Sequence, residues 1–154
     1  MTVRTSCYAV ASRLRDIRER DGAQHHPFIQ WAHSLTGLGQ DAADEIPWCA
    51  SFVSAVAFLL GLQYSRSAAA RSWLNQGQAI KLNEAEPGND VVILKRGRAP
   101  QPGPEVTSGA PGHVGFFAGV GPDGRIMLLG GNQSDGVNTQ SFDREDVLGV
   151  RRLA

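Results

Sequence analysis

Two side chains in this 154-residue sequence could together carry nucleophilic chemistry, Cys49 and His113. A thiolate attacks carbonyl carbons, and an imidazole can take the thiol proton and later give it to a leaving amine. The pair therefore indicates a cysteine hydrolase that cuts amide bonds through an acyl-thioester. Each residue also has a structural alternative, because cysteine is common on buried helix faces and histidine can hydrogen-bond a loop at a strand start.

The cysteine lies near the start of the most apolar segment of the chain, PWCASFVSAVAFLLG. Apolar residues recur in it at helical spacing, and proline is favoured at the first position of a helix. The pattern predicts a helix that begins at Pro47, is capped by Gly61 and holds Cys49 in its first turn. Free backbone N–H groups there would lower the pKa of the thiol and could bind the oxyanion that forms during attack.

The histidine opens the first strand of a predicted β-hairpin, HVGFFAGV and RIMLLGGN joined by the turn GPDG. If Val120 lies opposite Arg125, regular antiparallel pairing puts His113 opposite Asn132. The amide oxygen of Asn132 would then hold one imidazole nitrogen and leave the other free for the thiol. A glycine on the same face of the strand, Gly115, would leave room for another backbone or for substrate.

The partner of the histidine depends on the strand register, which two adjacent glycines make ambiguous. A bulge at Gly130 and Gly131 would shift the pairing and make Gln133 or Asp135 the residue that orients the imidazole. We take Asn132 as the expected partner, and these alternatives stay open.

The elements around these residues run from helices to strands, which is typical of an α+β protein. We expect one domain over residues 1–154. The chain predicts helices at 9–20, 27–35 and 67–76, short strands at 91–94 and 148–151, and a Pro- and Gly-rich loop at 97–112. The loop either covers a groove or links strands.

Several other residues are candidates for a part in the site. Trp48, beside the cysteine, is retained as a possible substrate contact, although a tryptophan in the core is the commoner case. Arg71 is expected to be a solvated helix arginine. His25, His26 and His33 have no evident carboxylate or cysteine partners, so we expect no metal and no other cofactor.

The strings DEIPWCASFV, ARSWL, GHVGFFAGV, GGNQ and LGVRR follow one another over residues 41–152. In this order they resemble the small phage and bacterial NlpC-like and CHAP-like cysteine peptidases, which are peptidoglycan hydrolases. The resemblance implies a papain-like α+β fold, with N-terminal helices packed on a small antiparallel sheet and a catalytic core over 41–152. It assigns Cys49 as nucleophile, His113 as base and Asn132 as orienting residue. CHAP-like enzymes often have an acidic residue where this chain has Gly130.

Charge and hydropathy exclude some partners. Fifteen basic and fifteen acidic residues give zero formal charge, which provides no overall attraction to nucleic acid or to an anionic membrane. The longest apolar runs are too short to span a bilayer, and no signal peptide is recognisable. We therefore expect synthesis in the cytoplasm and action on the cell wall or periplasm after release or delivery.

The resemblance also implies a substrate, the stem peptide of peptidoglycan, cut as an endopeptidase or as an amidase. The protein would act as a lysin or an antibacterial effector, with an immunity or delivery protein as a further partner. An acyltransferase or deamidase on the same fold is one alternative. A catalytically silent phage structural module is another, and it predicts that Cys49 is buried and inert.

Overall fold

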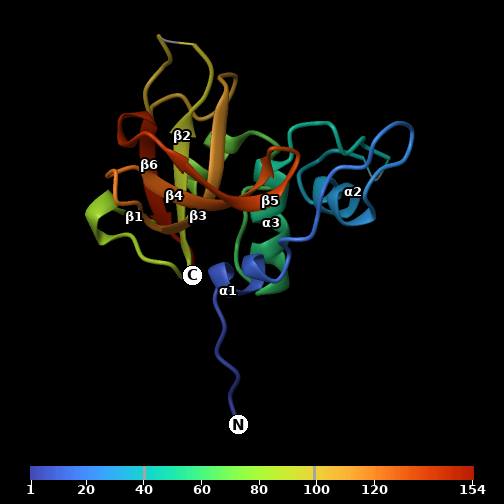
Figure 1. Ribbon diagram of the computed structural model, residues 1–154, viewed down its shortest axis with the longest axis horizontal. Coiled ribbons are helices and arrows are strands. Elements are labelled where there is room, and N and C mark those ends of the chain that lie inside the picture. Colours follow the sequence, from blue (N-terminus) through green and yellow to red (C-terminus); the bar gives the residue numbers. More distant parts are fainter. Residues whose placement is uncertain (40, 99) are drawn as a thin grey trace.

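The computed structural model describes residues 1–39, 41–98 and 100–154 (Figure 1). Gln40, in the polar segment before the cysteine, and Ala99, in the loop expected over 97–112, lie outside the described residues. In chain order the elements are α1 (Cys7–Ser12), α2 (Pro27–Ser34), α3 (Cys49–Leu59), the 3₁₀ helix η1 (Ala70–Asn75), β1 (Gln78–Ile80), η2 (Leu82–Glu84), β2 (Asp90–Lys95), β3 (Gly112–Val120), β4 (Ile126–Gln133), β5 (Gly136–Phe142), η3 (Arg144–Asp146) and β6 (Val147–Arg152).

The strands form a six-stranded antiparallel sheet in the order β1-β6-β2-β3-β4-β5. The predicted hairpin of β3 and β4 is present, and its turn is closed by the backbone N–H of Gly121, which donates to the carbonyl of Arg125 at 2.8 Å. β2 and the first half of β3 are almost wholly buried, which explains why they read as continuous apolar runs.

Helix α3 packs along one face of this sheet, and α2 lies on the far side of α3 (Figure 1). Every residue from Cys49 to Ala57 is buried, so the helix is apolar all round. Its Phe52 and Val53 join Val114 and Phe116 of β3 in the larger core cluster. A smaller apolar cluster lies on the opposite face of β3, around Phe117. The predicted α+β class is confirmed.

Helix boundaries differ from the sequence predictions where tertiary contacts compete with helical pairing. The helix expected over 9–20 ends at Ser12. The chain beyond it runs beside β5, where the N–H of Val137 donates to Ile17 and that of Glu19 donates to Asp135. The segment thereby covers part of an open sheet edge, which would otherwise present unpaired backbone groups. The helix expected over 67–76 is the shorter η1.

Within the described parts of the chain, no helix has both the length and the apolar character needed to cross a bilayer. The longest, α3, has 11 residues, whereas a span takes about 20.

Candidate active site

Cys49 is the first residue of α3 and follows Trp48 at the N-cap, so the helix begins two residues later than Pro47. The cysteine is in the first turn, as predicted, and its side chain lies on the sheet side with only 3% of the residue exposed. Backbone N–H groups of Val114, Ala50 and Cys49 itself act on the sulfur. Two of them come from the helix N-terminus and the third from β3. Such a set of donors could also hold an oxyanion formed at the sulfur.

The electrostatics of the thiol differ from the expectation. Burial raises the pKa of Cys49, and the opposing effects of the backbone N–H of Val114 and the positive charge of Arg96 do not cancel it. The prediction that the helix N-terminus leaves a lowered thiol pKa is therefore wrong in its net direction. The N–H donors are present, but desolvation outweighs them because the sulfur is almost sealed from water.

His113 lies near the start of β3, opposite Leu94, and its ring stacks on Phe142 with centroids 5.2 Å apart. Its Nε2 hydrogen-bonds Oε1 of Gln133 at 2.9 Å. Burial lowers the pKa of His113 to about 4, and the charge of Arg96 acts in the same direction while the bond to Gln133 opposes it. The imidazole is therefore neutral at pH 7 and able to accept a proton.

The amide of Gln133 fixes which imidazole nitrogen carries the hydrogen. Its Nε2 donates to the carbonyls of Leu128 at 3.2 Å and Asn138 at 2.7 Å. With the NH₂ group held by two acceptors, the amide oxygen faces the ring, so His113 must donate from Nε2. Nδ1 is then the unprotonated nitrogen, and among the described residues it has no hydrogen-bond partner.

The expected pairing of His113 with Asn132 is wrong, and the bulge that was left open as an alternative explains it. Phe116 lies opposite Leu129, as the predicted register requires, but Val120 lies opposite Ile126 rather than Arg125. Further along, β4 has a second irregularity between Gly130 and Gln133.

At this second irregularity Asn132 adopts a left-handed conformation, with φ of 58°. The bulge carries the side chain of Gln133 to the imidazole, whereas Asn132 lines a neighbouring cavity. The other alternative, Asp135, also has a positive φ and makes no contact with the ring among the described hydrogen bonds.

Two glycines make room for the Gln133 side chain. A Cβ at Gly130 would lie 2.5 Å from its Oε1, and one at Gly115 would lie 3.6 Å from the same atom. The space expected beside Gly115 for a backbone or substrate is filled by β4, with Leu128 Cβ and the Leu129 carbonyl oxygen nearer than the Gln133 amide. A side chain at position 130 would require the Gln133 amide to move from the place where it binds His113.

The side chains of Cys49 and His113 lie on different faces of β3. Cys49 belongs to the core cluster that contains Val114 and Phe116, whereas the His113 ring stacks on Phe142, which packs on the cluster around Phe117. The sulfur is beside Val114, the residue that follows His113, and neighbouring residues of a strand point to opposite faces. No hydrogen bond joins thiol and ring within the described parts of the chain. Cys49 lines a cavity of about 390 Å³ and His113 one of about 300 Å³, and both cavities are bordered by Arg96 and Gly97. A cavity of about 510 Å³ at the β1 and β6 end contains neither residue.

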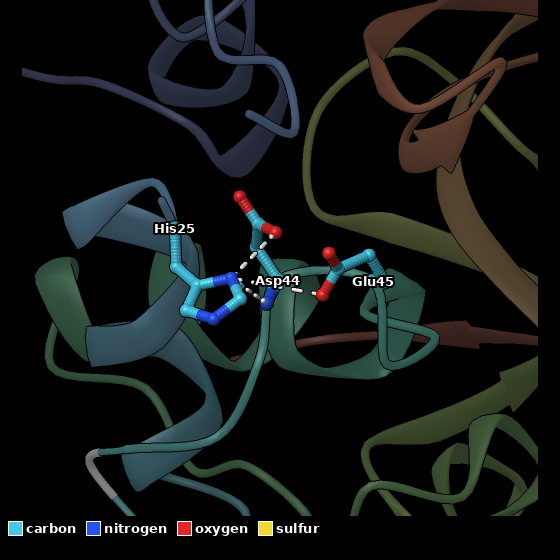
Figure 2. Close-up of side chains that lie close together, drawn as sticks. All are labelled: His25, Asp44 and Glu45. Atoms are coloured by element: carbon cyan, nitrogen blue, oxygen red, sulfur yellow. Dashed lines mark hydrogen bonds and ion pairs between the residues drawn. The ribbon is translucent and has the colours of Figure 1, made fainter. Parts of the chain in front are cut away.

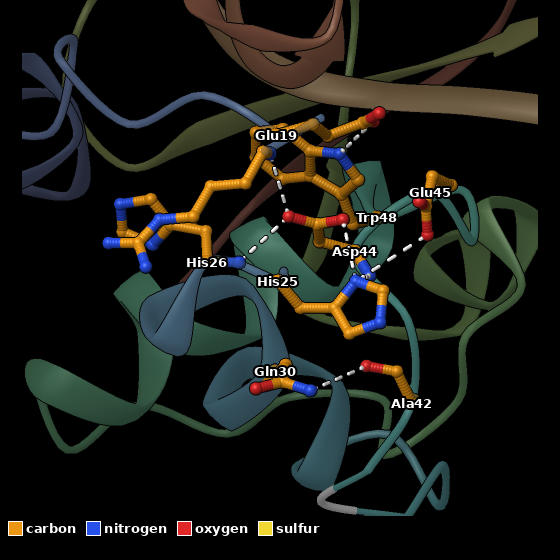
Figure 3. A network of polar contacts seen from close by, with 9 residues as sticks. Glu19, His25, His26, Gln30, Ala42, Asp44, Glu45 and Trp48 are labelled. Atoms are coloured by element: carbon orange, nitrogen blue, oxygen red, sulfur yellow. Dashed lines mark hydrogen bonds and ion pairs between the residues drawn. The ribbon is translucent and has the colours of Figure 1, made fainter. Parts of the chain in front are cut away.

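Trp48 lies in the core and presents no surface to a substrate, which disfavours the substrate contact considered for it from the sequence. Its side chain is fully buried, and a Cβ at Gly131 of β4 would lie 2.5 Å from its ring. The indole N–H donates to Glu19 at 2.7 Å (Figure 3). Trp48 is a core residue that fixes the chain immediately before Cys49.

A second anchor of the same segment is the buried carboxylate of Asp44 (Figures 2 and 3). Backbone N–H groups of Arg20 and His26 donate to its Oδ2 at 2.9 and 2.7 Å, and His25 contacts its Oδ1 at 3.1 Å. Burial raises the pKa of Asp44, but these hydrogen bonds outweigh burial and the pKa is lowered. The network ties the residues before α3 to the start of α2.

The same contacts correct one reason given against a metal site. His25 does have carboxylate neighbours, since its Nδ1 also lies 3.6 Å from Oε2 of Glu45 (Figure 2). The three side chains offer donor atoms within 4.8 Å of one another. Asp44 already has three hydrogen-bond partners, which account for the cluster without an ion.

Arg71 is fully buried rather than solvated, so that prediction is wrong. Its guanidinium donates to four carbonyl oxygens of the loop between β2 and β3, at 2.8 to 3.1 Å, those of Pro102, Gly103, Val106 and Pro111. Backbone carbonyls, rather than a carboxylate, are thus the partners of this buried guanidinium.

A cysteine at a helix start, a strand histidine held by an amide and an antiparallel sheet beneath them define the papain-like α+β class. The chain belongs to the CHAP domain family, which matches residues 41–132. Members of this family are in general cysteine peptidases or amidases, and the family implies a peptidoglycan substrate. The resemblance to NlpC-like and CHAP-like proteins is confirmed.

Among solved structures, the chain is similar to NlpC1 from Trichomonas vaginalis, with 19% sequence identity and a TM-score of 0.46. The match covers 89% of this chain and 47% of the NlpC1 chain, so this chain spans about half the length of that protein. A comparison with curated protein sequences finds no match.

Proposed function

We propose that this protein hydrolyses amide bonds in the stem peptide of peptidoglycan, as an endopeptidase or an amidase. Cys49 is the nucleophile, His113 the general base and Gln133 the residue that positions the imidazole. The observation that carries the proposal is the position of the Cys49 sulfur among backbone N–H donors, next to the start of the strand that holds His113.

The chemistry begins from two neutral groups. Thiol and imidazole are not hydrogen-bonded in the described structure, so the proposal requires the ring and the sulfur to come together when substrate binds. As the sulfur of Cys49 attacks the amide carbon, Nδ1 of His113 accepts the thiol proton, and the C=O electrons move to oxygen. The N–H groups at the start of α3 and at Val114 stabilise that oxyanion. The imidazolium then protonates the leaving amine and the C–N bond breaks, which leaves a thioester. Water, deprotonated by His113, attacks the thioester and releases the acid and the thiol.

We also propose a biological setting. A protein of this class meets peptidoglycan outside the cytoplasm, so we propose that it reaches the wall by release or delivery and acts there as a lysin or an antibacterial effector. An effector of this kind would have a delivery protein, and its producer would have an immunity protein.

The burial of Cys49 favours a second candidate, a catalytically silent structural or binding module. The thiol of a residue that is only 3% exposed, with a raised pKa, reacts slowly unless the base and the substrate reach it. An acyltransferase or deamidase would use the same cysteine but give different products.

One experiment separates these functions. Purified protein and its Cys49→Ala and Cys7→Ala variants are incubated with sacculi, and the released muropeptides are identified by mass spectrometry. Cys7 provides the matched control, because it is a buried thiol in α1 whose pKa burial raises to about 12. We expect new peptide ends from the wild type and from Cys7→Ala, and none from Cys49→Ala. Absence of Cys49-dependent products would leave the silent module, and products joined to an added amine would indicate the acyltransferase.

A further inference from the structure

Two arginines lie beside the candidate site, and they differ in how their guanidinium groups are used. Arg71 is buried, and its donors are taken by four carbonyls of the loop between β2 and β3. Four of its five N–H donors are thereby engaged within the protein. Arg96 is exposed, directly after β2, and no hydrogen bond or ion pair engages its guanidinium among the residues that the structure describes.

Arg96 borders both cavities of the candidate site. It lines the cavity that holds Cys49 and the cavity that holds His113, and its charge acts on both of these residues. A substrate that reaches the sulfur from one cavity and the imidazole from the other must pass this side chain.

We propose that Arg96 is a specificity-determining residue that binds a carboxylate of the substrate peptide beside the bond attacked by Cys49. This inference rests on the proposed function, since it concerns the substrate of that same site. A guanidinium presents two parallel N–H donors that match the two oxygens of a carboxylate, and such charge-assisted contacts are about twice as strong as neutral ones.

The lining of the two cavities indicates on which side the carboxylate binds. The His113 cavity also contains Lys95 and Asp146, whose opposite charges offset one another, so an anion there would meet a carboxylate as well as cations. In the Cys49 cavity, Arg96 is the charged residue among the described lining residues, and its other walls are small or apolar, including Ala68, Ala69, Ala70, Ala110 and Gly112. The cavity therefore fits a residue with a small side chain next to a carboxylate held by Arg96.

The first test measures the attraction of an anion to Cys49 without any hydrolysis. Iodoacetate and iodoacetamide alkylate the same sulfur, but only iodoacetate carries a carboxylate. The ratio of their rates at Cys49, followed by peptide mass mapping to exclude Cys7, cancels changes in thiol pKa. We expect Arg96→Gln to lower the iodoacetate-to-iodoacetamide ratio about tenfold, and Arg96→Lys to lower it less.

The matched control is Arg98→Gln, because Arg98 is an exposed arginine two residues further along the same loop and is not among the residues that line the two cavities. It should leave the ratio unchanged. Equal ratios in the wild type and in Arg96→Gln would overturn the proposal. The ratio remains measurable if sacculi are not cut at all, so failure of the proposed function and failure of this inference can be told apart.

The second test uses hydrolysis of synthetic stem peptides whose carboxylates are either free or converted to amides. With wild-type protein we expect KM to be about tenfold lower for the free carboxylate. With Arg96→Gln this difference should disappear while kcat changes little. An equal preference in both proteins, or a loss of kcat at unchanged KM, would overturn a substrate-binding role for Arg96.

Discussion

At the residue scale, the resting site holds two uncharged groups rather than a thiolate and an imidazolium. Burial raises the pKa of Cys49 and lowers that of His113 to about 4. Each shift favours the neutral form, since desolvation penalises charge. The thiol proton therefore has to leave the sulfur during the attack. This transfer requires Nδ1 of His113 to come within hydrogen-bond distance of the thiol.

This charge state predicts the pH dependence of thiol reactivity. Only the thiolate reacts, so a raised pKa delays reactivity to higher pH. The rate of Cys49 alkylation by iodoacetamide should rise at a higher pH than that of free cysteine, whose pKa is about 8.5. His113→Asn should show the same profile above pH 6, because His113 is already neutral there. A midpoint below that of free cysteine would contradict neutral groups.

The hydrogen bond from His113 to Gln133 predicts that substitutions of Gln133 and Asn132 affect kcat differently. Gln133→Ala removes the acceptor at His113 Nε2, so we expect kcat to fall by about ten- to a hundredfold with little change in KM. The ¹⁵N shifts of the imidazole should then show loss of the Nε2–H tautomer, which a purely structural defect would not cause. Asn132→Ala is the control and should keep kcat within about threefold. If Asn132→Ala has the larger effect on kcat, the assignment of Gln133 is wrong.

At the element scale, the site depends on how closely α3 approaches β4. Gly131 lies against Trp48 and Phe52, where a Cβ would be 2.5 to 2.7 Å from their atoms. The glycine at this position allows the helix start, and hence Cys49, to sit on the sheet.

Gly131→Ala should therefore push the helix from the sheet. We expect a loss of about 1 to 3 kcal/mol in the free energy of unfolding, measured with urea, because overpacking displaces buried side chains. Gly88→Ala is the control, since a Cβ there would lie 4.0 Å from its nearest neighbour, the carbonyl oxygen of Glu86. Equal stability of the two variants would show that Gly131 is not packed tightly against Trp48 and Phe52.

The loop between β2 and β3 is attached to η1 through the hydrogen bonds of Arg71. Arg71→Met removes four donors from its carbonyls. We expect faster amide hydrogen exchange over residues 100–112 and a loss of about 2 kcal/mol or more of stability. Arg98→Met serves as the control. Unchanged exchange in Arg71→Met would mean that the loop holds its shape without the guanidinium.

At the scale of the whole molecule, the sequence predicted those helices and strands whose buried faces give a recognisable pattern of apolar residues. The apolar segment of α3, the β3 and β4 hairpin and strand β6 are all present. Strands β1 and β5 were not predicted, because β5 carries a largely polar sequence, GVNTQSF, and β1 has only three residues. Their strand state comes from pairing with β6 and β4.

The candidate site was likewise predictable only in part. Cys49 and His113 could be singled out from residue type and position, and the two glycines 130 and 131 signalled the bulge. The backbone angles of the bulge, such as the positive φ of Asn132, decide which side chain reaches His113. The local sequence does not reveal these angles. The burial of Arg71 and Trp48 likewise depends on segments that are distant along the chain.

The central claim is that Cys49 forms a covalent bond with an amide substrate, and trapping the acyl-enzyme tests it most directly. Protein mixed with sacculi is quenched in acid during turnover, and the site of any added mass is mapped by peptide mass spectrometry. The account predicts a thioester on Cys49 in the wild type and in Cys7→Ala, its accumulation altered in Gln133→Ala, and no adduct in Cys49→Ala. Muropeptide release by Cys49→Ala at the wild-type rate, or an adduct on Cys7 instead, would contradict it.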